Sequence, residues 1–141
     1  MIRDFKPQDM DSVLSIWLEA SVKAHAFVDR HFWEARVEDI RNIYIPDSET
    51  YVFEEEETVK GFVSLDGNSL AAIFVSPESQ GRGIGRQLMD KAKSLREKLN
   101  LTVYKENRKS VRFYEKNGFI HVGERVDTYT GHTEIVMEYG R

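Results

Sequence analysis

A short glycine-rich run, Gln80-Gly81-Arg82-Gly83-Ile84-Gly85, separates an apolar segment from an amphipathic one. The apolar segment, residues 70–75, predicts a strand that is buried on both faces. After the run, apolar residues recur every three or four positions, which predicts one helix carrying Ile84, Leu88, Ala92, Leu95 and Leu99. The first N–H groups of a helix lack partners within it, and glycines let a ligand approach the backbone closely. The turn therefore predicts a cradle for a phosphate group.

Charge is unevenly distributed along the chain. Residues 81–116 contain 11 Lys/Arg and 4 Asp/Glu, a balance of +7, whereas the whole chain has a formal net charge of −4 and the remainder therefore carries −11. A basic band beginning at the turn favours a polyanionic small ligand, although an ordinary mixed surface is the alternative. The acidic remainder argues against a nucleic-acid partner and favours a cationic second substrate.

The bulk composition excludes several kinds of protein. The 141 residues suit one domain, residues 1–141, with a single core. Without cysteine there is no disulfide, thiolate zinc site or cysteine nucleophile, and four scattered histidines give no metal-ligand spacing, so we expect no metal. No apolar run approaches the ~20 residues that span a bilayer, and the N-terminus lacks the apolar core of a signal peptide. We therefore expect a cytoplasmic monomer or homodimer without a membrane partner.

Hydrophobic periodicity and turn residues predict an α/β fold in the order β-α-α-β-β-β-α-β-α-β-β. Residues 1–5 form the first predicted strand, Pro7 and Asp9 open the first helix, and helical pieces follow over residues 21–45. The other predicted strands are residues 51–53, 59–65, 70–75, 101–104, 119–126 and 134–139, and the other predicted helices begin at Ile84 and Ser110.

The glycine-rich turn is neither a dinucleotide fingerprint nor a Walker motif. Arg86 stands where the fingerprint needs glycine, and no Gly-Lys-Ser/Thr follows. The pattern Gln80-x-x-Gly83-x-Gly85 instead resembles the acyl-CoA-binding turn of the GNAT superfamily of N-acetyltransferases.

A second segment strengthens this resemblance. Asn107 is followed by Phe113-Tyr114 and then by Gly118-Phe119, which is similar to a later GNAT motif. The two motifs occur in the expected order, and the order of elements matches over nearly the whole chain. Two shorter patterns, His25-x-Phe27 and Thr130-Gly131-His132-x-Glu134, also look like features of one bacterial subgroup.

The resemblance implies a GNAT-like mixed, mostly antiparallel central sheet flanked by helices. It also implies acetyl-CoA as co-substrate, with the pyrophosphate on the turn and the pantetheine arm along the preceding strand. The cofactor-binding residues carried over are Ile73, Phe74, Val75, Gly81, Arg82, Gly83, Ile84, Gly85, Arg86, Asn107 and Tyr114. Backbone N–H groups and the guanidinium groups of Arg82 and Arg86 are suitable donors to phosphate oxygens.

Acetyl transfer from sulfur to an amine needs a neutral amine, a stabilised oxyanion and a proton donor for the thiolate. By resemblance, the Phe74 N–H stabilises the oxyanion and the Tyr114 phenol is the proton donor, although core packing is an alternative role for Tyr114. A covalent acyl-enzyme is not expected, because no cysteine and no Ser/His/Asp set is evident. The expected function is direct transfer from acetyl-CoA to a primary amine of a small molecule, a protein lysine or an N-terminus.

The general base is where the sequence departs from the superfamily. Relatives often carry glutamate at the places that hold Ser69 and Thr102 here, and neither residue is a base. The candidates that remain are ordered water, Glu19, His25, Tyr129 and His132. The missing glutamate leaves a second function open, an acyl-CoA-binding sensor without turnover. A nucleotide-phosphate binder is a third, and it would be protected against heating by ATP or NAD rather than by coenzyme A.

Overall fold

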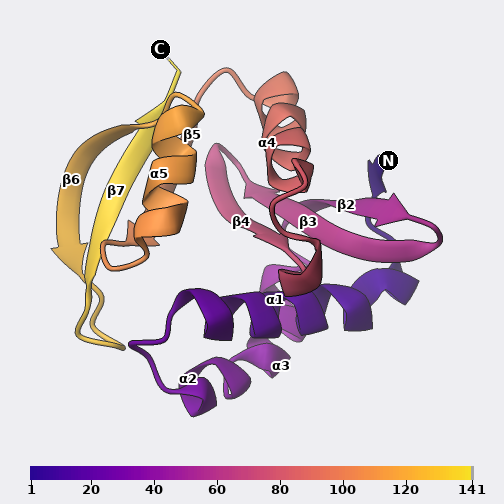
Figure 1. Ribbon diagram of the computed structural model, residues 1–141, viewed down its shortest axis with the longest axis horizontal. Helices are drawn as coiled ribbons and strands as arrows, with labels where there is room; N and C mark the ends of the chain where they lie inside the picture. Colours follow the sequence, from indigo (N-terminus) through magenta and orange to yellow (C-terminus); the bar gives the residue numbers. More distant parts are fainter. Residues whose placement is uncertain (141) are drawn as a thin grey trace.

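One seven-stranded sheet, in the order β1-β2-β3-β4-β5-β7-β6, forms the centre of the computed structural model, which describes residues 1–140 (Figure 1). Neighbouring strands are antiparallel except β4 and β5, which are parallel. The expected mixed, mostly antiparallel sheet is confirmed. Its strands are β1 (Ile2–Asp4), β2 (Glu49–Glu55), β3 (Thr58–Asp66), β4 (Ser69–Val75), β5 (Leu99–Tyr104), β6 (Ile120–Val126) and β7 (Thr133–Tyr139).

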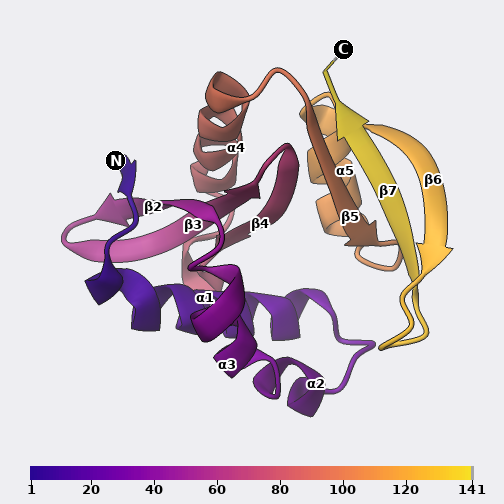
Figure 2. The same cartoon turned by 180° about the vertical axis from the view of Figure 1, so that it is seen from behind.

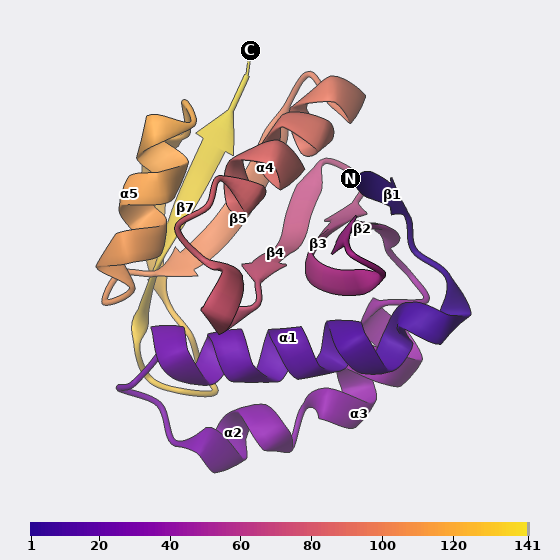
Figure 3. The same cartoon turned by 45° about the vertical axis from the view of Figure 1, so that its right-hand side comes forward.

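Helices cover both faces of the sheet (Figures 1 and 3). On one face lie α1 (Met10–Ala24), α2 (Arg30–Glu34), α3 (Val37–Asp39) and the π-helical turn η2 (Ile40–Tyr44). On the other face lie α4 (Ile84–Leu95) and α5 (Arg108–Lys116). Short 3-10 turns, η1 (Pro7–Asp9) and η3 (Pro77–Ser79), precede α1 and α4. The sequence predicted these helices, including the broken helical region before β2.

Two apolar cores, and not the single core expected from the chain length, fix the helices against the sheet, because each face of the sheet is covered by its own helices. Val63, Leu88 and Met89 belong to the core beneath α4 and α5, where each is fully buried. Val13 and Phe62 belong to the core beneath α1 to α3. Because successive side chains of a strand point to opposite faces, β3 contributes Phe62 to one core and Val63 to the other. Each face of the sheet thus holds its helices in fixed positions.

The helix after the glycine-rich turn is shorter than the hydrophobic repeat predicted. It ends at Leu95, since Arg96 has extended backbone angles (φ −139°, ψ 133°), and Leu99 begins β5 instead. Leu99 is nevertheless buried in the same core as Leu88. Leu99 continues the hydrophobic spacing of the helix because α4 and β5 bury their apolar side chains in the same core.

Strands β4 and β5 pair at a single position, Ser69 opposite Asn100, and then diverge (Figure 2). The β3–β4 register shifts after Ser64, so that Ala71 is an extra residue on β4, as in a β-bulge. The prediction that residues 70–75 are buried on both faces is wrong: Leu70 is buried, Ala71 is exposed and the next four residues are half-buried. The divergence leaves this strand without a neighbour on its β5 side.

Gly61 of β3 marks a close approach beside this opening. A Cβ atom there would lie 2.9 Å from the Phe74 carbonyl oxygen and 3.1 Å from Leu88 Cδ1. We expect Gly61→Ala to lower the free energy of unfolding by about 1–3 kcal/mol, because the backbone oxygen cannot yield as a flexible side chain would. Urea denaturation measures the change.

The matched control for this prediction is Gly123→Ala on β6, where no neighbouring atom lies within 4 Å of the added Cβ. Its effect should stay within about 0.5 kcal/mol. Equal effects of the two substitutions would show that the close approach at Gly61 does not limit stability.

Candidate active site

A groove of about 910 Å³ opens between the diverging β4 and β5. Residues of α4 and α5 line one side of it, including Gly85 and Tyr114, and residues of α1 and α2 line the other, including Ser21 and Trp33. Every cofactor-binding residue expected from the sequence lines this groove except Arg82. The groove thus joins the two faces of the sheet at the place where β4 and β5 stop pairing.

The glycine-rich turn forms one end of the groove. Gly83 precedes α4 with φ +84°, a left-handed conformation that favours glycine, and Gly81 has φ +81°. The N–H groups of the first turn of α4 have no acceptor within the helix, as at any helix start. With the positive end of the helix dipole, they make this end of the groove suited to an anion.

Arginine side chains at the turn have two different environments. Arg86 lines the groove. The guanidinium group of Arg82 instead donates to the Glu55 carboxylate at 2.8 Å. The Arg82 side chain is thus paired with a carboxylate that is not part of the groove wall, whereas Arg86 lines the groove; a phosphate contact of either side chain stays a prediction. Three further cations in the groove wall were not singled out from the sequence, namely Lys23, Arg108 and Lys109.

The β3–β4 ladder determines which backbone groups of β4 reach the groove. Val75 lies opposite Gly61, and the next amide, Ser76 N–H, donates to the Lys60 carbonyl at 2.8 Å. In an antiparallel ladder, pairs that exchange hydrogen bonds alternate with pairs that do not. The bond from Ser76 to Lys60 therefore makes the neighbouring pair, Val75 and Gly61, one that does not exchange hydrogen bonds. The backbone groups of Val75 therefore point away from β3. Consistently, the Val75 carbonyl accepts a hydrogen bond from Gln80 Nε2 at 3.1 Å.

Because the backbone N–H groups of successive residues point to opposite edges of a strand, the Phe74 N–H does not point where its expected role requires. Phe74 lies opposite Phe62 in the next pair, which is the pair that exchanges both backbone hydrogen bonds. Its N–H is thus turned toward β3 and is not available to an oxyanion in the groove. The N–H groups of Ile73 and Val75 point to the open side instead. The strand was predicted correctly, but the identity of the free amides depends on the register and could not be predicted.

Tyr114 lies on α5 with its ring between those of Phe113 and Phe119, at centroid distances of 5.6 and 5.7 Å. Tyr114 lines the groove, and within residues 1–140 its hydroxyl forms no hydrogen bond. Burial of the ring raises the pKa of Tyr114 to about 12, so the phenol is protonated at neutral pH.

His25 is buried at the end of α1, and both of its ring nitrogens are engaged. Nδ1 lies 2.8 Å from the Ser21 carbonyl oxygen, and Nε2 lies 3.3 Å from Asn107 Nδ2. Because a carbonyl can only accept, Nδ1 carries the proton and Nε2 accepts from the Asn107 amide. Burial lowers the pKa of His25, which keeps the ring neutral. With no free nitrogen, His25 is not the base.

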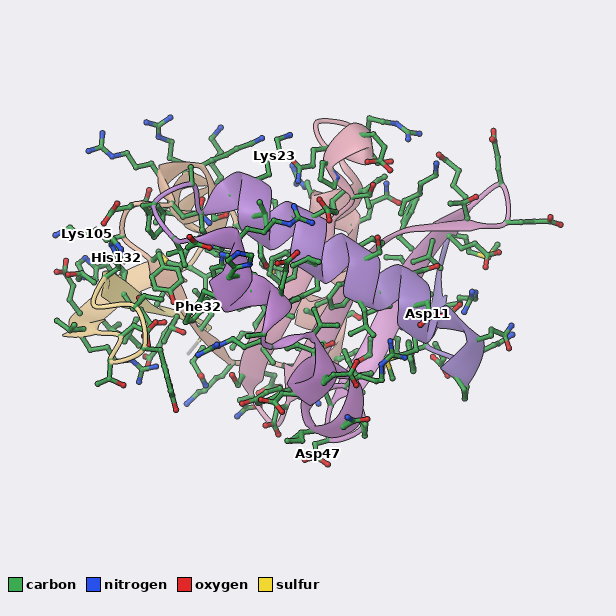
Figure 4. All side chains as sticks on the ribbon, turned by 90° about the horizontal axis from the view of Figure 1, so that it is seen from below. Asp11, Lys23, Phe32, Asp47, Lys105 and His132 are labelled. Carbon is green, nitrogen blue, oxygen red and sulfur yellow. The ribbon has the colours of Figure 1, made fainter. Side chains whose placement is uncertain are left out.

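The other three candidate bases lie outside the groove wall. Glu19 pairs with Arg30 at 2.9 Å, and Tyr129 is 78% exposed. His132 pairs with Glu106 at 2.7 Å on the loop between β6 and β7. In Figure 4, Asp11 and Lys23 mark the two ends of α1, and His132 lies beyond the Lys23 end. Two carboxylates line the groove among the residues described, Glu106 and Glu134, and the sequence did not single out either as a base.

Residues 1–140 contain no group of three or more His, Cys, Asp or Glu side chains that could hold a metal ion. Within the same residues, no helix has the length and apolar character needed to cross a membrane.

Comparisons with known proteins agree with this geometry. Residues 46–121 match the family described as acetyltransferase (GNAT) domain. The chain is 34% identical over 120 residues to the peptidyl-lysine N-acetyltransferase YiaC of Escherichia coli K12, covering 84% of this chain and 82% of YiaC. It is 29% identical over 119 residues to the peptidyl-lysine N-acetyltransferase YjaB of the same organism, covering 84% and 80%.

Solved structures show the same fold. The apo form of YjaB from Escherichia coli superimposes with a TM-score of 0.86 at 26% identity, covering 100% of this chain and 98% of YjaB. PaiA N-acetyltransferase from Thermoplasma acidophilum, solved with coenzyme A, superimposes with a TM-score of 0.85 at 19% identity and covers 100% and 98%. The interrupted ladder, the glycine-rich turn and these matches lead to one conclusion: the chain belongs to the GNAT family and is an N-acetyltransferase.

Proposed function

We propose that this protein transfers an acetyl group from acetyl-CoA directly to a primary amine, either a peptidyl lysine or a small molecule. The observation that carries the proposal is the single groove, which contains both an anion cradle at the start of α4 and the phenol of Tyr114. The names of the YiaC and YjaB relatives support peptidyl lysine as the acceptor, and the coenzyme A bound in the PaiA structure supports the donor.

In this proposal the pyrophosphate of acetyl-CoA binds at the turn and at Arg86, and the pantetheine arm extends along the open edge of β4. Its amides can pair with the free backbone groups of Val75 and Ile73 as an added strand would. Ile73 lies two residues farther from the cradle than Val75, which is about 7 Å along a strand. The thioester carbonyl then lies nearest Ile73, whose N–H takes the oxyanion role first assigned to Phe74.

The proposed role of Tyr114 is to donate a hydrogen bond to the departing sulfur. Its pKa of about 12 makes it a weaker acid than a thiol of pKa about 8.5, so full proton transfer to a free thiolate would be uphill by about 5 kcal/mol. A hydrogen bond to the charge that develops on sulfur avoids that cost. Tyr114 gives its proton to the sulfur only as the nitrogen of the tetrahedral intermediate returns a proton to the phenol oxygen. The phenol is thereby restored.

Asn107 and His25 position the helix that carries Tyr114. Asn107 precedes α5, and its side-chain oxygen accepts from the Ser110 N–H at 3.3 Å. Its amide nitrogen donates to His25 Nε2, so one side chain both caps α5 and attaches it to the end of α1. Tyr114 lies two turns farther along the same helix. We propose this positioning role for Asn107 in addition to the pantetheine contact expected from the resemblance.

Tyr114→Phe tests the proposed chemistry. It should lower kcat by about 100-fold, the usual effect of losing a positioned proton donor, and change the Kd of coenzyme A less than threefold. Thiol release from acetyl-CoA with a lysine peptide measures kcat, and calorimetry measures Kd. Binding of coenzyme A without thiol release by the wild type, over a panel of amines, would favour the sensor function instead.

Arg86→Ala tests the phosphate site. Loss of a charge-assisted hydrogen bond worth about 1.5–3 kcal/mol should weaken coenzyme A binding by roughly 10- to 150-fold in calorimetry. Arg82→Ala is the matched control, because its guanidinium is held by Glu55, and it should weaken binding less than about threefold. A larger loss from Arg82→Ala than from Arg86→Ala would contradict this placement of the pyrophosphate.

The His25 pKa predicts how stability depends on pH. The folded-state pKa lies below the ordinary value of 6.5, so the unfolded chain binds the proton more readily. This contribution to stability is complete above the unfolded pKa and is lost as the pH falls below about 6.5. Urea denaturation at pH 7.5 and 5 should show the loss in the wild type and a smaller loss in His25→Gln, which cannot titrate.

Asn107→Asp provides the second half of this test. Asp caps a helix as well as Asn does, but its carboxylate cannot donate to Nε2 and instead favours a protonated ring. The pKa of His25, followed by NMR titration, should therefore rise above its wild-type value. An unchanged His25 pKa in this variant would show that the hydrogen bond between the two side chains is absent in solution.

A further inference from the structure

The two short subgroup-like patterns in the sequence meet at one end of the groove, around Tyr104 of β5. The rings of His25 and Phe27 lie 5.2 and 5.6 Å from that of Tyr104, and the Phe27 ring lies 4.8 Å from that of His132. Figure 1 shows the loop between β6 and β7 reaching the connection between α1 and α2. Segments that are about a hundred residues apart thus form a common wall at this end of the groove, and of its members His25, Tyr104 and Glu134 line the groove itself.

Glu134 is the carboxylate that this wall contributes. It lies on β7 directly opposite Tyr104, so the two side chains share the face of the sheet that α1 and α2 cover. Its side chain is 17% exposed and lines the groove. One carboxylate oxygen accepts from Arg125 Nε at 3.2 Å, and the second has no hydrogen-bond partner within residues 1–140.

Glu106, the other carboxylate of the groove wall, is a poorer candidate for acceptor recognition. Its side chain is 52% exposed and it already pairs with His132. Glu134, by contrast, lies opposite Tyr104 and lines the groove together with Tyr104 and Trp33, whose rings can contact a cation or an alkyl stem. Trp17 and Trp33 continue this lining from α1 and α2, with their ring centroids 5.8 Å apart.

We propose that Glu134 binds the ammonium group of the acceptor and takes up its first proton, which makes the acceptor a primary alkylamine on an unbranched stem, as in a lysine side chain. This inference rests on the proposed function. It assigns the base that the sequence lacks at Ser69 and Thr102. The carboxylate lies on a strand far along the chain from both, on the α1 side of the groove, opposite the side where α5 carries Tyr114.

The reaction balances with these groups. The ammonium gives one proton to the Glu134 carboxylate, and the neutral nitrogen forms the new C–N bond to the thioester carbon. As the oxyanion collapses, the C–S bond breaks, sulfur receives a proton from the Tyr114 phenol, and the second nitrogen proton restores that phenol. Glu134 then releases its proton to solvent. The products are the amide, the free thiol and one proton.

The test compares Glu134→Gln with the wild type, using acetyl-CoA and the amide of Nα-acetyllysine as the probe. Kcat/KM for the probe at pH 7 should fall at least 100-fold, as expected for loss of a general base, while the Kd of coenzyme A stays within threefold. Two variants serve as controls. Glu138→Gln removes an exposed carboxylate of β7 that is not part of the groove wall, and Arg125→Gln removes the ion pair while keeping Glu134; both should retain kcat/KM within about fivefold.

The pH dependence separates this role from a merely structural one. Raising the pH toward the lysine pKa of about 10.4 supplies neutral amine without a base, so the ratio of wild-type to Glu134→Gln activity should shrink between pH 7 and 10. The structure places two charged or titratable groups against Glu134, namely Arg125 through the ion pair and Tyr104 opposite it on β5. Burial and a hydrogen bond to Asp127 raise the pKa of Tyr104 to about 12, above this pH range.

The inference would be overturned by Glu134→Gln activity within threefold of wild type, by a ratio that does not change with pH, or by an equal loss in Arg125→Gln. Each of these outcomes leaves the proposed function intact, provided that the wild type acetylates the probe. If the wild type binds coenzyme A but releases no thiol with any amine, the proposed function fails instead. Acetylation of other amines with no activity on the alkylamine probe would overturn the assigned acceptor class.

Discussion

The site depends on one interruption of backbone pairing. Strands β4 and β5 are parallel neighbours that pair only where Ser69 lies opposite Asn100, and the extra residue at Ala71 turns β4 away from β5 beyond that point. A sheet interior normally satisfies its own N–H and C=O groups, and unpaired groups in a buried position are costly. Here the unpaired edge lies on an open groove, where an extended ligand that carries amides can complete the ladder.

The same interruption lets the two faces of the sheet cooperate. The groove wall includes the start of α4 and Tyr114 from one face, and the end of α1 with Trp33 and Tyr104 from the other. A continuous ladder would separate these groups. The hydrogen bond between His25 and Asn107 then fixes the relative position of α1 and α5 across the opening. The end of α1 and the start of the helix that carries Tyr114 are thus positioned together.

Much of this could be predicted from the sequence because it depends on local pattern. The glycine-rich turn, the helix that follows it and the motif around Tyr114 are each encoded within a few residues, and the structure places them around one groove. The features that could not be predicted depend on pairing between distant segments. Whether Ile73 or Phe74 offers a free N–H follows from the register with β3, and the Arg82 side chain is occupied by a residue far along the chain.

Glu134 illustrates the same limit. Its position opposite Tyr104 results from the β5–β7 register, and the wall around it combines segments from the beginning and the end of the chain. The sequence patterns around His25 and Glu134 were visible, but nothing in their spacing indicated that they meet. The carboxylate proposed as the base therefore lies on β7, one strand beyond β5, and not at Ser69 or Thr102.

A crystal structure with a stable acetyl-CoA analogue, in which the sulfur is replaced by a methylene group, measures the central geometry directly. The carbonyl oxygen of the analogue should lie about 3 Å from the Ile73 backbone nitrogen, with the methylene within hydrogen-bonding reach, about 3.5 Å, of the Tyr114 hydroxyl. Binding of the pantetheine arm outside the opening between β4 and β5, or a carbonyl oxygen bonded to the Phe74 nitrogen instead, would contradict it.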